Sequence, residues 1–474
     1  MKNTIKCICL LISALILFSS CQSVYEIPLE TTAPPEGFEI DPDQEYFTMG
    51  YPYKSGDPTS GLLYEGCLIY IEKIPTTGII GYKGTGTEKT PVYGDTYVER
   101  IVKYNPVTGV VSSPCLIPTC NHSLESDCPL LFPPTDEKVY HYYFRGIFGD
   151  WLVIFEQYRN EEYVNLFEQT FYNLKTGEVR RVFDDDLGSD VLIRWNGGSY
   201  HDGKYYIVKQ ILDYSQTGYK PGVEGQSIKN YEPITKQYLY EYDFEAGTSK
   251  ELFYVTPGFN IGAVSNQRFY FGDDTRKIVS YPKDATEGSS KQNEKEMSGM
   301  GVSNLLGTYS FFFNNDGYTV YDRQTDTQTD IVFDYSITCN VCVTESGILS
   351  SHQTAYDEWK IFSAAEYRRQ NPNATSSEVN SASRKILGEG TAQIWKCGFM
   401  GEDQQVIFEL KNAFIKTIAS QGDYVFATIE HYDTETGDVT ANPNGKRCVI
   451  NIKTGEITEI PFLDIVVPEW YVNE

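Results

Sequence analysis

The sequence predicts an all-β chain that folds as a single β-propeller, most simply with seven four-stranded blades. Three observations predict this fold class. A short turn phrase recurs along the chain, a burst of aromatic and aliphatic residues stands before most of its copies, and no long amphipathic helix is evident. Four-stranded sheets that repeat without helices are typical of a propeller, because radial stacking leaves only short sheet edges.

The turn phrase predicts a β-hairpin at each copy. Its clearest form is "YNLKTGEV" from Tyr172, and the other copies are "YNPVTGVV" from Tyr104, "YDFEAGTS" from Tyr242, "YDRQTDTQ" from Tyr321 and "NIKTGEIT" from Asn451. The Asn or Asp side chain can accept hydrogen bonds from nearby backbone and so start a turn. The glycine can take the positive φ that such a hairpin needs.

The apolar bursts predict strands at the centre of stacked sheets. "GDWLVIF" from Gly149 and "GDYVFAT" from Gly422 are apolar at consecutive positions, which indicates strands covered on both faces. The most closely spaced units repeat about every 40 residues, which is the spacing expected for four-stranded blades. Six or eight blades, or a string of β-sandwiches, are the alternatives. Counting bursts gives seven units, near residues 62–115, 139–185, 197–256, 259–296, 302–335, 337–412 and 413–462.

The Ser- and Asn-rich stretch 364–390 is predicted to be a mobile loop inside one of these units. Within it, residues 364–372 are expected to form one short helical turn.

The N-terminal segment predicts export and a lipid anchor. Lys2 and Lys6 precede an apolar run at residues 7–18, which is shorter than the ~20 residues of a membrane-spanning helix. The following "FSSC" resembles the lipobox of bacterial lipoproteins, and by that resemblance Cys21 carries the lipid. The alternative is an ordinary cleaved signal with an incidental cysteine.

This segment divides the chain into a signal peptide (1–20), a lipidated cysteine with a flexible tether (21–58) and the propeller (59–474). The predicted location is the extracytoplasmic face of a bacterial cell membrane. The intact mass of the mature chain would show whether Cys21 is acylated.

A cysteine cluster is the most distinctive stretch of the chain. "CLIPTCNHSLESDCPLLF" places Cys115, Cys120, His122 and Cys128 in a C-x4-C-x-H-x5-C-P pattern. Three thiolates and an imidazole would complete a tetrahedral zinc shell. The alternative is disulfide chemistry, which exported chains commonly use. This phrase resembles one found in predicted β-propeller surface lipoproteins of Gram-positive gut bacteria, and the lipobox and the repeats add to the resemblance. The resemblance implies a propeller held at the cell surface.

The remaining cysteines are candidates for disulfides. In "CNVC", the two thiols of a strand would point to opposite faces and lie too far apart to be bridged to each other. Packing in the core, or bridges to other cysteines, is therefore expected. The candidates are Cys67, Cys339, Cys342, Cys397 and Cys448.

No catalytic residue is predicted, because the chain lacks a G-x-S-x-G elbow, an H-E-x-x-H zinc helix and a Walker A loop. The predicted function is a membrane-anchored extracytoplasmic binding or scaffold protein that uses the propeller rim, and a non-enzymatic chain is favoured. The alternative is an extracellular glycan-active hydrolase or lyase with carboxylates at the propeller centre.

The expected partners are the membrane, through the anchor, and an envelope protein or glycan. The net charge of −26 argues against nucleic acid. The chain is expected to be a monomer, with zinc at the Cys115–Cys128 cluster as its candidate cofactor.

Overall fold

The computed structural model describes most of the chain between residues 61 and 461. The predicted signal peptide (1–20), Cys21 and the tether lie outside the described residues, as does Cys339, and these stay predictions. In the part that is described, no helix is long and apolar enough to cross a membrane. The gaps are residues 84–89, 121, 123–127, 133–138, 160–164, 182–190, 221–229, 273–277, 287–294, 298–304, 307–308, 315, 323–326, 339–340, 345–346, 422 and 432–445.

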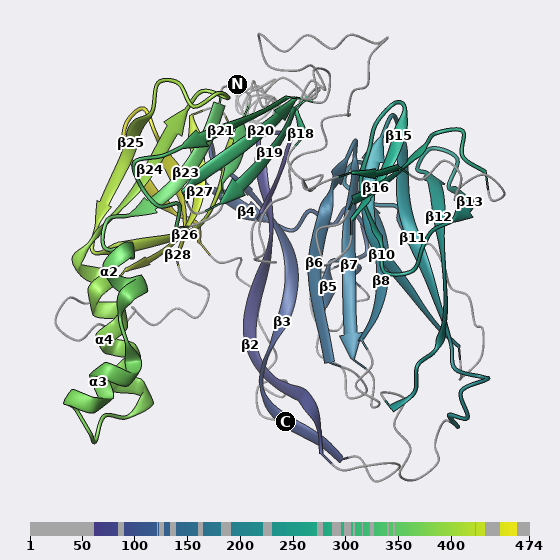
Figure 1. Ribbon diagram of the computed structural model, residues 1–474, viewed down its shortest axis with the longest axis horizontal. Helices are drawn as coiled ribbons and strands as arrows, with labels where there is room; N and C mark the ends of the chain where they lie inside the picture. The colour runs from purple at the N-terminus through teal and green to yellow at the C-terminus, as the bar shows by residue number, and fades with distance from the viewer. Residues whose placement is uncertain are drawn as a thin grey trace, which may run out of the picture. The chain divides into compact units, whose positions relative to one another are not determined.

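The described chain is built mainly from antiparallel four-stranded meanders, and Figure 1 draws their strands as arrows. The first meander is β1 (Leu62–Tyr64), β2 (Cys67–Lys83), β3 (Thr90–Asn105) and β4 (Val110–Ser112), with β5 (Leu131–Phe132) paired to β3. The second is β6 (Val139–Phe148), β7 (Trp151–Arg159), β8 (Asn165–Asn173) and β9 (Val179–Arg181). The third is β10 (Val191–His201), β11 (Lys204–Asp213), β12 (Ile234–Asp243) and β13 (Thr248–Tyr254).

The later meanders follow the same pattern. The fourth is β14 (Asn260–Val264), β15 (Arg268–Gly272), β16 (Ile278–Pro282) and β17 (Lys295–Met297), and the fifth is β18 (Leu305–Leu306), β19 (Tyr309–Asn314), β20 (Gly317–Asp322) and β21 (Thr327–Val332). The sixth is β22 (Cys342–Thr344), β23 (Gly347–Gln353), β24 (Thr391–Cys397) and β25 (Gln405–Lys411). The last is β26 (Ala413–Gln421), β27 (Tyr424–His431), β28 (Lys446–Asn451) and β29 (Ile457–Glu459).

The meanders form separate sheets, with one exception. The second and third share an eight-stranded sheet, because β8 and β10 pair in parallel at Phe167 and Arg194. The prediction of an all-β chain of antiparallel four-stranded units is confirmed. Among the described strands, no pairing closes the sheets into a barrel.

The recurring turn phrase makes the hairpin that the sequence predicts. The Asn173 carboxamide oxygen accepts hydrogen bonds from the backbone N–H groups of Lys175 and Thr176, each at 2.9 Å. The Gly177 N–H then donates to the Asn173 carbonyl at 2.8 Å, with Gly177 at φ 76°. The same hydrogen bonds and a positive-φ glycine recur at the turns that begin at Asn105, Asp243 and Asn451.

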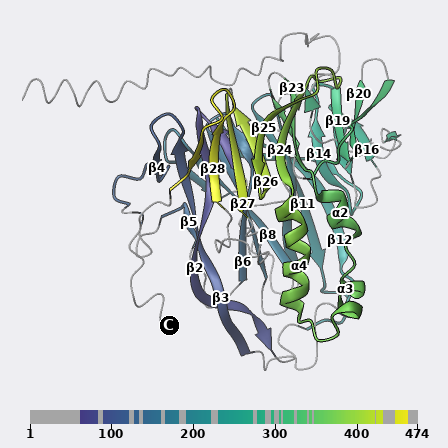
Figure 2. The ribbon, with the colours of Figure 1, turned by 90° about the vertical axis from the view of Figure 1, so that its left-hand side faces the viewer.

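The prediction of a mobile loop at residues 364–390 is wrong. The connection between β23 and β24 folds into α2 (Tyr356–Ile361), α3 (Ala364–Gln370) and α4 (Ser376–Glu389), which lie beside one another (Figure 2). A capping box begins α4: Thr375 Oγ1 accepts from the Glu378 N–H, and the Glu378 carboxylate accepts from the Thr375 N–H. These bonds satisfy backbone donors that would otherwise be exposed at the helix start.

Several pairs of meanders pack against each other through shared apolar clusters. One cluster joins Ile71 and Ile101 of the first meander to Phe144 and Leu152 of the second. Another joins the last meander back to the first, through Phe426 and Val449 on one side and Leu68, Tyr70 and Val102 on the other. Sheets covered on both faces explain why the apolar bursts show no alternation.

His201, at the end of β10, should make the chain sensitive to acid. Burial, and to a smaller extent the positive charge of Lys283, lower the pKa of His201 to about 4, although Asp202 acts in the opposite direction. Because the pKa in the folded state lies below the unfolded value of about 6.5, stability is full above pH 6.5 and is lost as the pH falls from 6.5 to 4. The loss should reach about 3 kcal/mol.

Urea unfolding of the native chain and of His201→Gln between pH 7 and 4 measures this loss. The wild-type free energy of unfolding should fall more steeply with acid than that of the variant. Parallel curves for the two proteins would show that His201 does not titrate in this window.

Candidate metal centre

The structure brings together the four residues of the predicted cluster. Cys115 follows β4, Cys128 precedes β5, and Cys120 and His122 lie on the segment between them. One ligand atom from each residue lies within 4.8 Å of all the others. The Nδ1 atom of His122 is 3.2 Å from the Cys120 sulfur and 3.9 Å from the Cys128 sulfur.

These spacings suit one metal ion bound by four ligands in tetrahedral geometry. With Zn–S bonds of about 2.3 Å, sulfur ligands stand roughly 3.8 Å apart. His122 also has φ 56°, a left-handed conformation that is uncommon for a residue other than glycine. The chain therefore takes a sparsely populated backbone conformation at the residue that supplies the one nitrogen ligand.

The thiols lie in a low-dielectric environment. Burial raises the pKa of Cys115, and the nearby Cys120 thiol raises it further. Burial is also the main reason that the pKa of Cys128 is raised. Three thiolates this close would repel one another, so a divalent cation is what would hold them deprotonated together.

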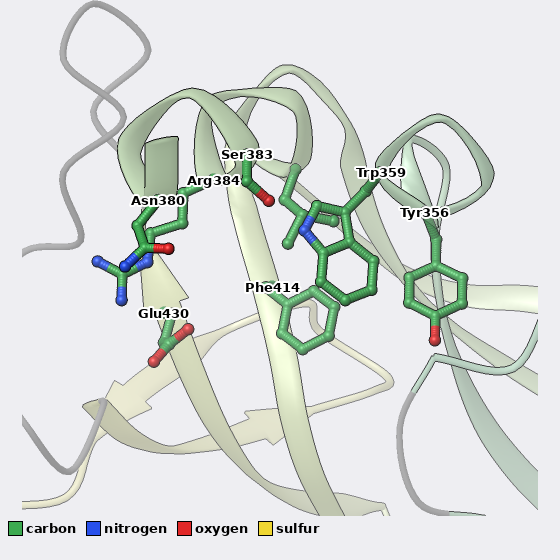
Figure 3. A pocket seen from close by; sticks show the side chains of 8 residues that line it. Tyr356, Trp359, Asn380, Ser383, Arg384, Phe414 and Glu430 are labelled. Atoms are coloured by element: carbon green, nitrogen blue, oxygen red, sulfur yellow. The ribbon is translucent and has the colours of Figure 1, made fainter. Parts of the chain in front are cut away.

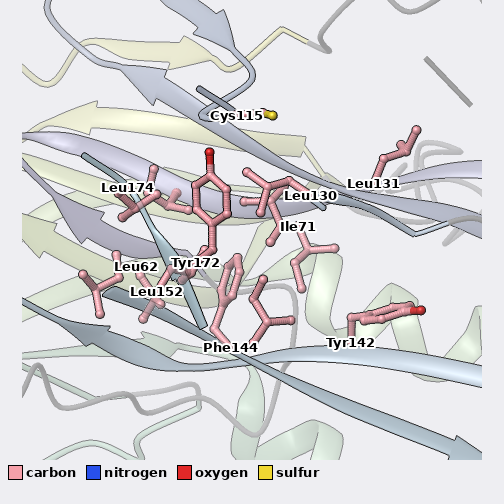
Figure 4. Packing of buried hydrophobic residues seen from close by; sticks show 14 of the residues in the cluster. Leu62, Ile71, Cys115, Leu130, Leu131, Tyr142, Phe144, Leu152, Tyr172 and Leu174 are labelled. Carbon is pink, nitrogen blue, oxygen red and sulfur yellow. The ribbon is translucent and has the colours of Figure 1, made fainter. Parts of the chain in front are cut away.

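The cluster rests on the apolar interface between the first two meanders. Cys115 and Cys128 belong to the buried cluster that also contains Leu130, Tyr172 and Leu174, and Cys120 packs against it. Figure 4 shows the Tyr172 hydroxyl directed toward the segment that carries Cys115. Local hydrogen bonds shape the loop, including those from Cys120 N–H to the Ile117 carbonyl at 3.0 Å and from Leu131 N–H to the Cys128 carbonyl at 3.2 Å.

Tyr172 of β8 fixes the backbone next to Cys115. Its hydroxyl accepts a hydrogen bond from the Leu116 N–H at 2.8 Å and donates one to the Pro114 carbonyl at 3.3 Å. Burial raises the pKa of Tyr172 to about 12, so the hydroxyl keeps the proton that it donates. The sequence analysis missed this residue, and the one signal was its place in the clearest copy of the turn phrase.

The other predicted cysteines stand apart from the cluster. Cys67 begins β2, Cys342 begins β22, Cys397 ends β24 and Cys448 lies in β28, and none of them belongs to the four-residue group. In the described part of the chain, no cysteine is in a disulfide. Burial raises the pKa of Cys397 and of Cys448 to about 11, which makes these thiols unreactive at neutral pH.

A pocket beside the helical insertion is a second feature that the sequence did not predict. It has a volume of about 390 Å³. The side-chain amide of buried Gln353 donates to the carbonyl of the lining residue Leu387 at 3.0 Å and to that of Ala413, next to the lining residue Phe414, at 2.6 Å. In Figure 3, Trp359 and Phe414 lie between Tyr356 on one side and the polar groups of Asn380, Arg384 and Glu430 on the other. The lining residues are Tyr356, Trp359, Asn380, Ser383, Arg384, Leu387, Phe414 and Glu430.

Comparison with known proteins finds similar solved structures at low identity. No protein-family model and no curated protein matches the chain. A puromycin hydrolase is 8% identical, with TM-score 0.41, over 89% of this chain and 56% of that one. An acylaminoacyl peptidase is 11% identical, with TM-score 0.41, over 85% and 52%. The WD40 domain of SCAP from fission yeast is 9% identical, with TM-score 0.28, over 85% and 92%.

These comparisons correct the predicted function. A non-catalytic binding or scaffold protein, with a glycan-active enzyme as the alternative, was expected, whereas structures such as the hydrolase and the peptidase are named for other hydrolytic activities. That prediction is therefore wrong. The chain spans about half the length of those two enzymes, and at these identities and TM-scores no activity is carried over from them.

Proposed function

We propose that the chain binds one zinc ion through Cys115, Cys120, His122 and Cys128, and that the ion has a structural role. The convergence of the four ligand atoms within 4.8 Å carries this proposal. Three sulfurs and one nitrogen are a donor set that suits zinc. Four protein ligands fill a tetrahedral shell and leave no open position for a substrate, which is the pattern of structural rather than catalytic zinc.

The position of the cluster suggests what the ion does. The ligands lie on the connection from β4 to β5, and this connection packs against the second meander through the shared apolar cluster. An ion that holds the loop in one conformation would therefore hold its apolar side chains against β8. Binding free energy of a structural zinc becomes folding free energy, because the unfolded chain has no preformed site.

Metal analysis of the purified chain tests this proposal. We expect about one zinc per chain in the native protein and in Cys448→Ser, and almost none in Cys128→Ser. Cys448 is a suitable control because it is a buried cysteine in a different meander, 4% exposed against 7% for Cys128. Disulfides linking Cys115, Cys120 or Cys128, found by peptide mapping of protein that contains no zinc, would contradict the proposal and support the alternative predicted from the sequence.

We further propose that the seven meanders form a single seven-bladed propeller. It is supported by the cluster that the first and last meanders share, and by the Arg447 guanidinium, which donates to the Ile71 carbonyl at 2.6 Å and lies 4.6 Å from the centre of the Tyr70 ring. Contacts between the first and last repeats are what a closed ring requires. An experimental structure would count the blades, and a gap between the two meanders would contradict closure.

A further inference from the structure

The hairpin of the second meander contacts the loop that carries the metal ligands. Cys115 lies between the two residues whose backbone groups bond to the Tyr172 hydroxyl, Pro114 and Leu116. Tyr172, which lies on a neighbouring strand 56 residues after Leu116 in the chain, therefore holds the backbone on both sides of Cys115. Tyr172 itself is fully buried, so its ring has one fixed position.

The same hairpin supports the loop through its glycine. A Cβ atom at Gly177 would stand 3.1 Å from the Cβ atom of Leu116. The equivalent glycines of two other turns, Gly109 and Gly455, have nothing within 4 Å, and Gly247 faces the guanidinium of Arg180. The four turns share one hydrogen-bond pattern, but of their four glycines it is Gly177, in the turn of the second meander, that lies against the ligand loop.

We propose that Tyr172 is a positioning residue of the metal centre, which holds the Cys115 sulfur where the other three ligands converge. This inference rests on the proposed zinc site. Tyr172 does not supply a ligand atom; its hydroxyl bonds to the backbone on either side of Cys115 and also interacts with the Cys115 thiol itself. Metal affinity thereby depends on the packing of the second meander against the first.

Removing the hydroxyl should weaken the metal without abolishing it. Loss of an outer-shell hydrogen-bonding partner typically costs 10- to 100-fold in metal affinity. Tyr172→Phe keeps the buried ring and leaves the Leu116 N–H and the Pro114 carbonyl without this partner. We expect its zinc dissociation constant to rise by 10- to 100-fold, with the stoichiometry still one.

The experiment titrates the full chain with Co²⁺ and then displaces it with Zn²⁺. Co²⁺ reports its surroundings by its visible and thiolate charge-transfer absorption, which a merely structural change elsewhere would leave unaltered. The native protein and the control Tyr104→Phe should give the same spectrum and affinity, because Tyr104 is just as buried but packs against the last meander. Tyr172→Phe should bind more weakly and show an altered spectrum.

The outcomes separate the two proposals. Native protein that binds neither ion would end the zinc proposal itself. Native protein that binds, with Tyr172→Phe equal to it in affinity and spectrum, would overturn the role of Tyr172 alone. Should Tyr172→Phe fail to fold, Leu116→Pro removes the same hydrogen bond from the loop side, at a residue that is 47% exposed, and the same loss of affinity is expected.

Discussion

Removing the metal with a chelator should lower the free energy of unfolding of the native chain by about 4 kcal/mol, when compared with protein held at zinc concentrations 1,000 times the dissociation constant. A ligand that binds only the folded state stabilises it by mass action. The folded chain brings the four ligands together on the loop from β4 to β5, which packs on the second meander, and the unfolded chain has no such preformed site. Chemical unfolding at fixed zinc, with and without chelator, measures the difference.

The control is Cys128→Ser, whose stability should not respond to the chelator, because one of the four ligands is missing. The native chain should become as stable as this variant once its zinc is gone. Equal stability of native protein with and without chelator, in samples where metal analysis shows that the zinc has left, would contradict a structural role.

Replacing Arg100 with methionine should destabilise the chain by about 3–5 kcal/mol, the cost of breaking a buried ion pair from one side. The Nε and Nη2 atoms of Arg100 both contact the Glu72 carboxylate. The side chains are only 5% and 1% exposed, so water cannot replace the guanidinium. The preceding residue of β3, Glu99, is a second buried carboxylate on the opposite face of the sheet, and it forms an ion pair with Lys73 at 3.1 Å and accepts from the Tyr142 N–H at 3.3 Å.

Lys446→Met provides the matched control, since the ion pair of Lys446 with Glu459 is 42% and 54% exposed. An exposed pair of this kind contributes less than about 1 kcal/mol. The double variant Glu72→Leu with Arg100→Met should recover most of the loss, because it removes both buried charges. Urea unfolding of the native chain, the two single variants and the double variant measures these losses. Equal losses for Arg100→Met and Lys446→Met would contradict the expected effect of burial.

The sequence predicts the local parts of this fold well, because they depend on residues close together in the chain. The hydrogen bonds from Lys175 and Thr176 to Asn173 span two or three residues, so the phrase itself specifies the turn. The four ligands also lie within fourteen consecutive residues, and their convergence is the part of the site that the sequence could predict.

The sequence analysis missed one local signal, the capping box at residues 375–378, and the contacts between residues far apart in the chain. The Ser and Asn content of residues 364–390 suggested a loop, but the capping box of Thr375 and Glu378 and the attachment of Gln353 to Leu387 stabilise helices there. Tyr172 contributes to the metal centre through residues far away in the chain, which no local pattern reveals. Spacing alone also could not choose between zinc and disulfides, because both need the same thiols in the same place.

Zinc-edge X-ray absorption of the purified chain is the most direct test of the metal centre. A tetrahedral shell of three sulfurs at about 2.3 Å and one nitrogen at about 2.0 Å is the predicted result. A shell without sulfur, or with fewer than three sulfurs, would contradict the assignment of Cys115, Cys120, His122 and Cys128 as the ligands.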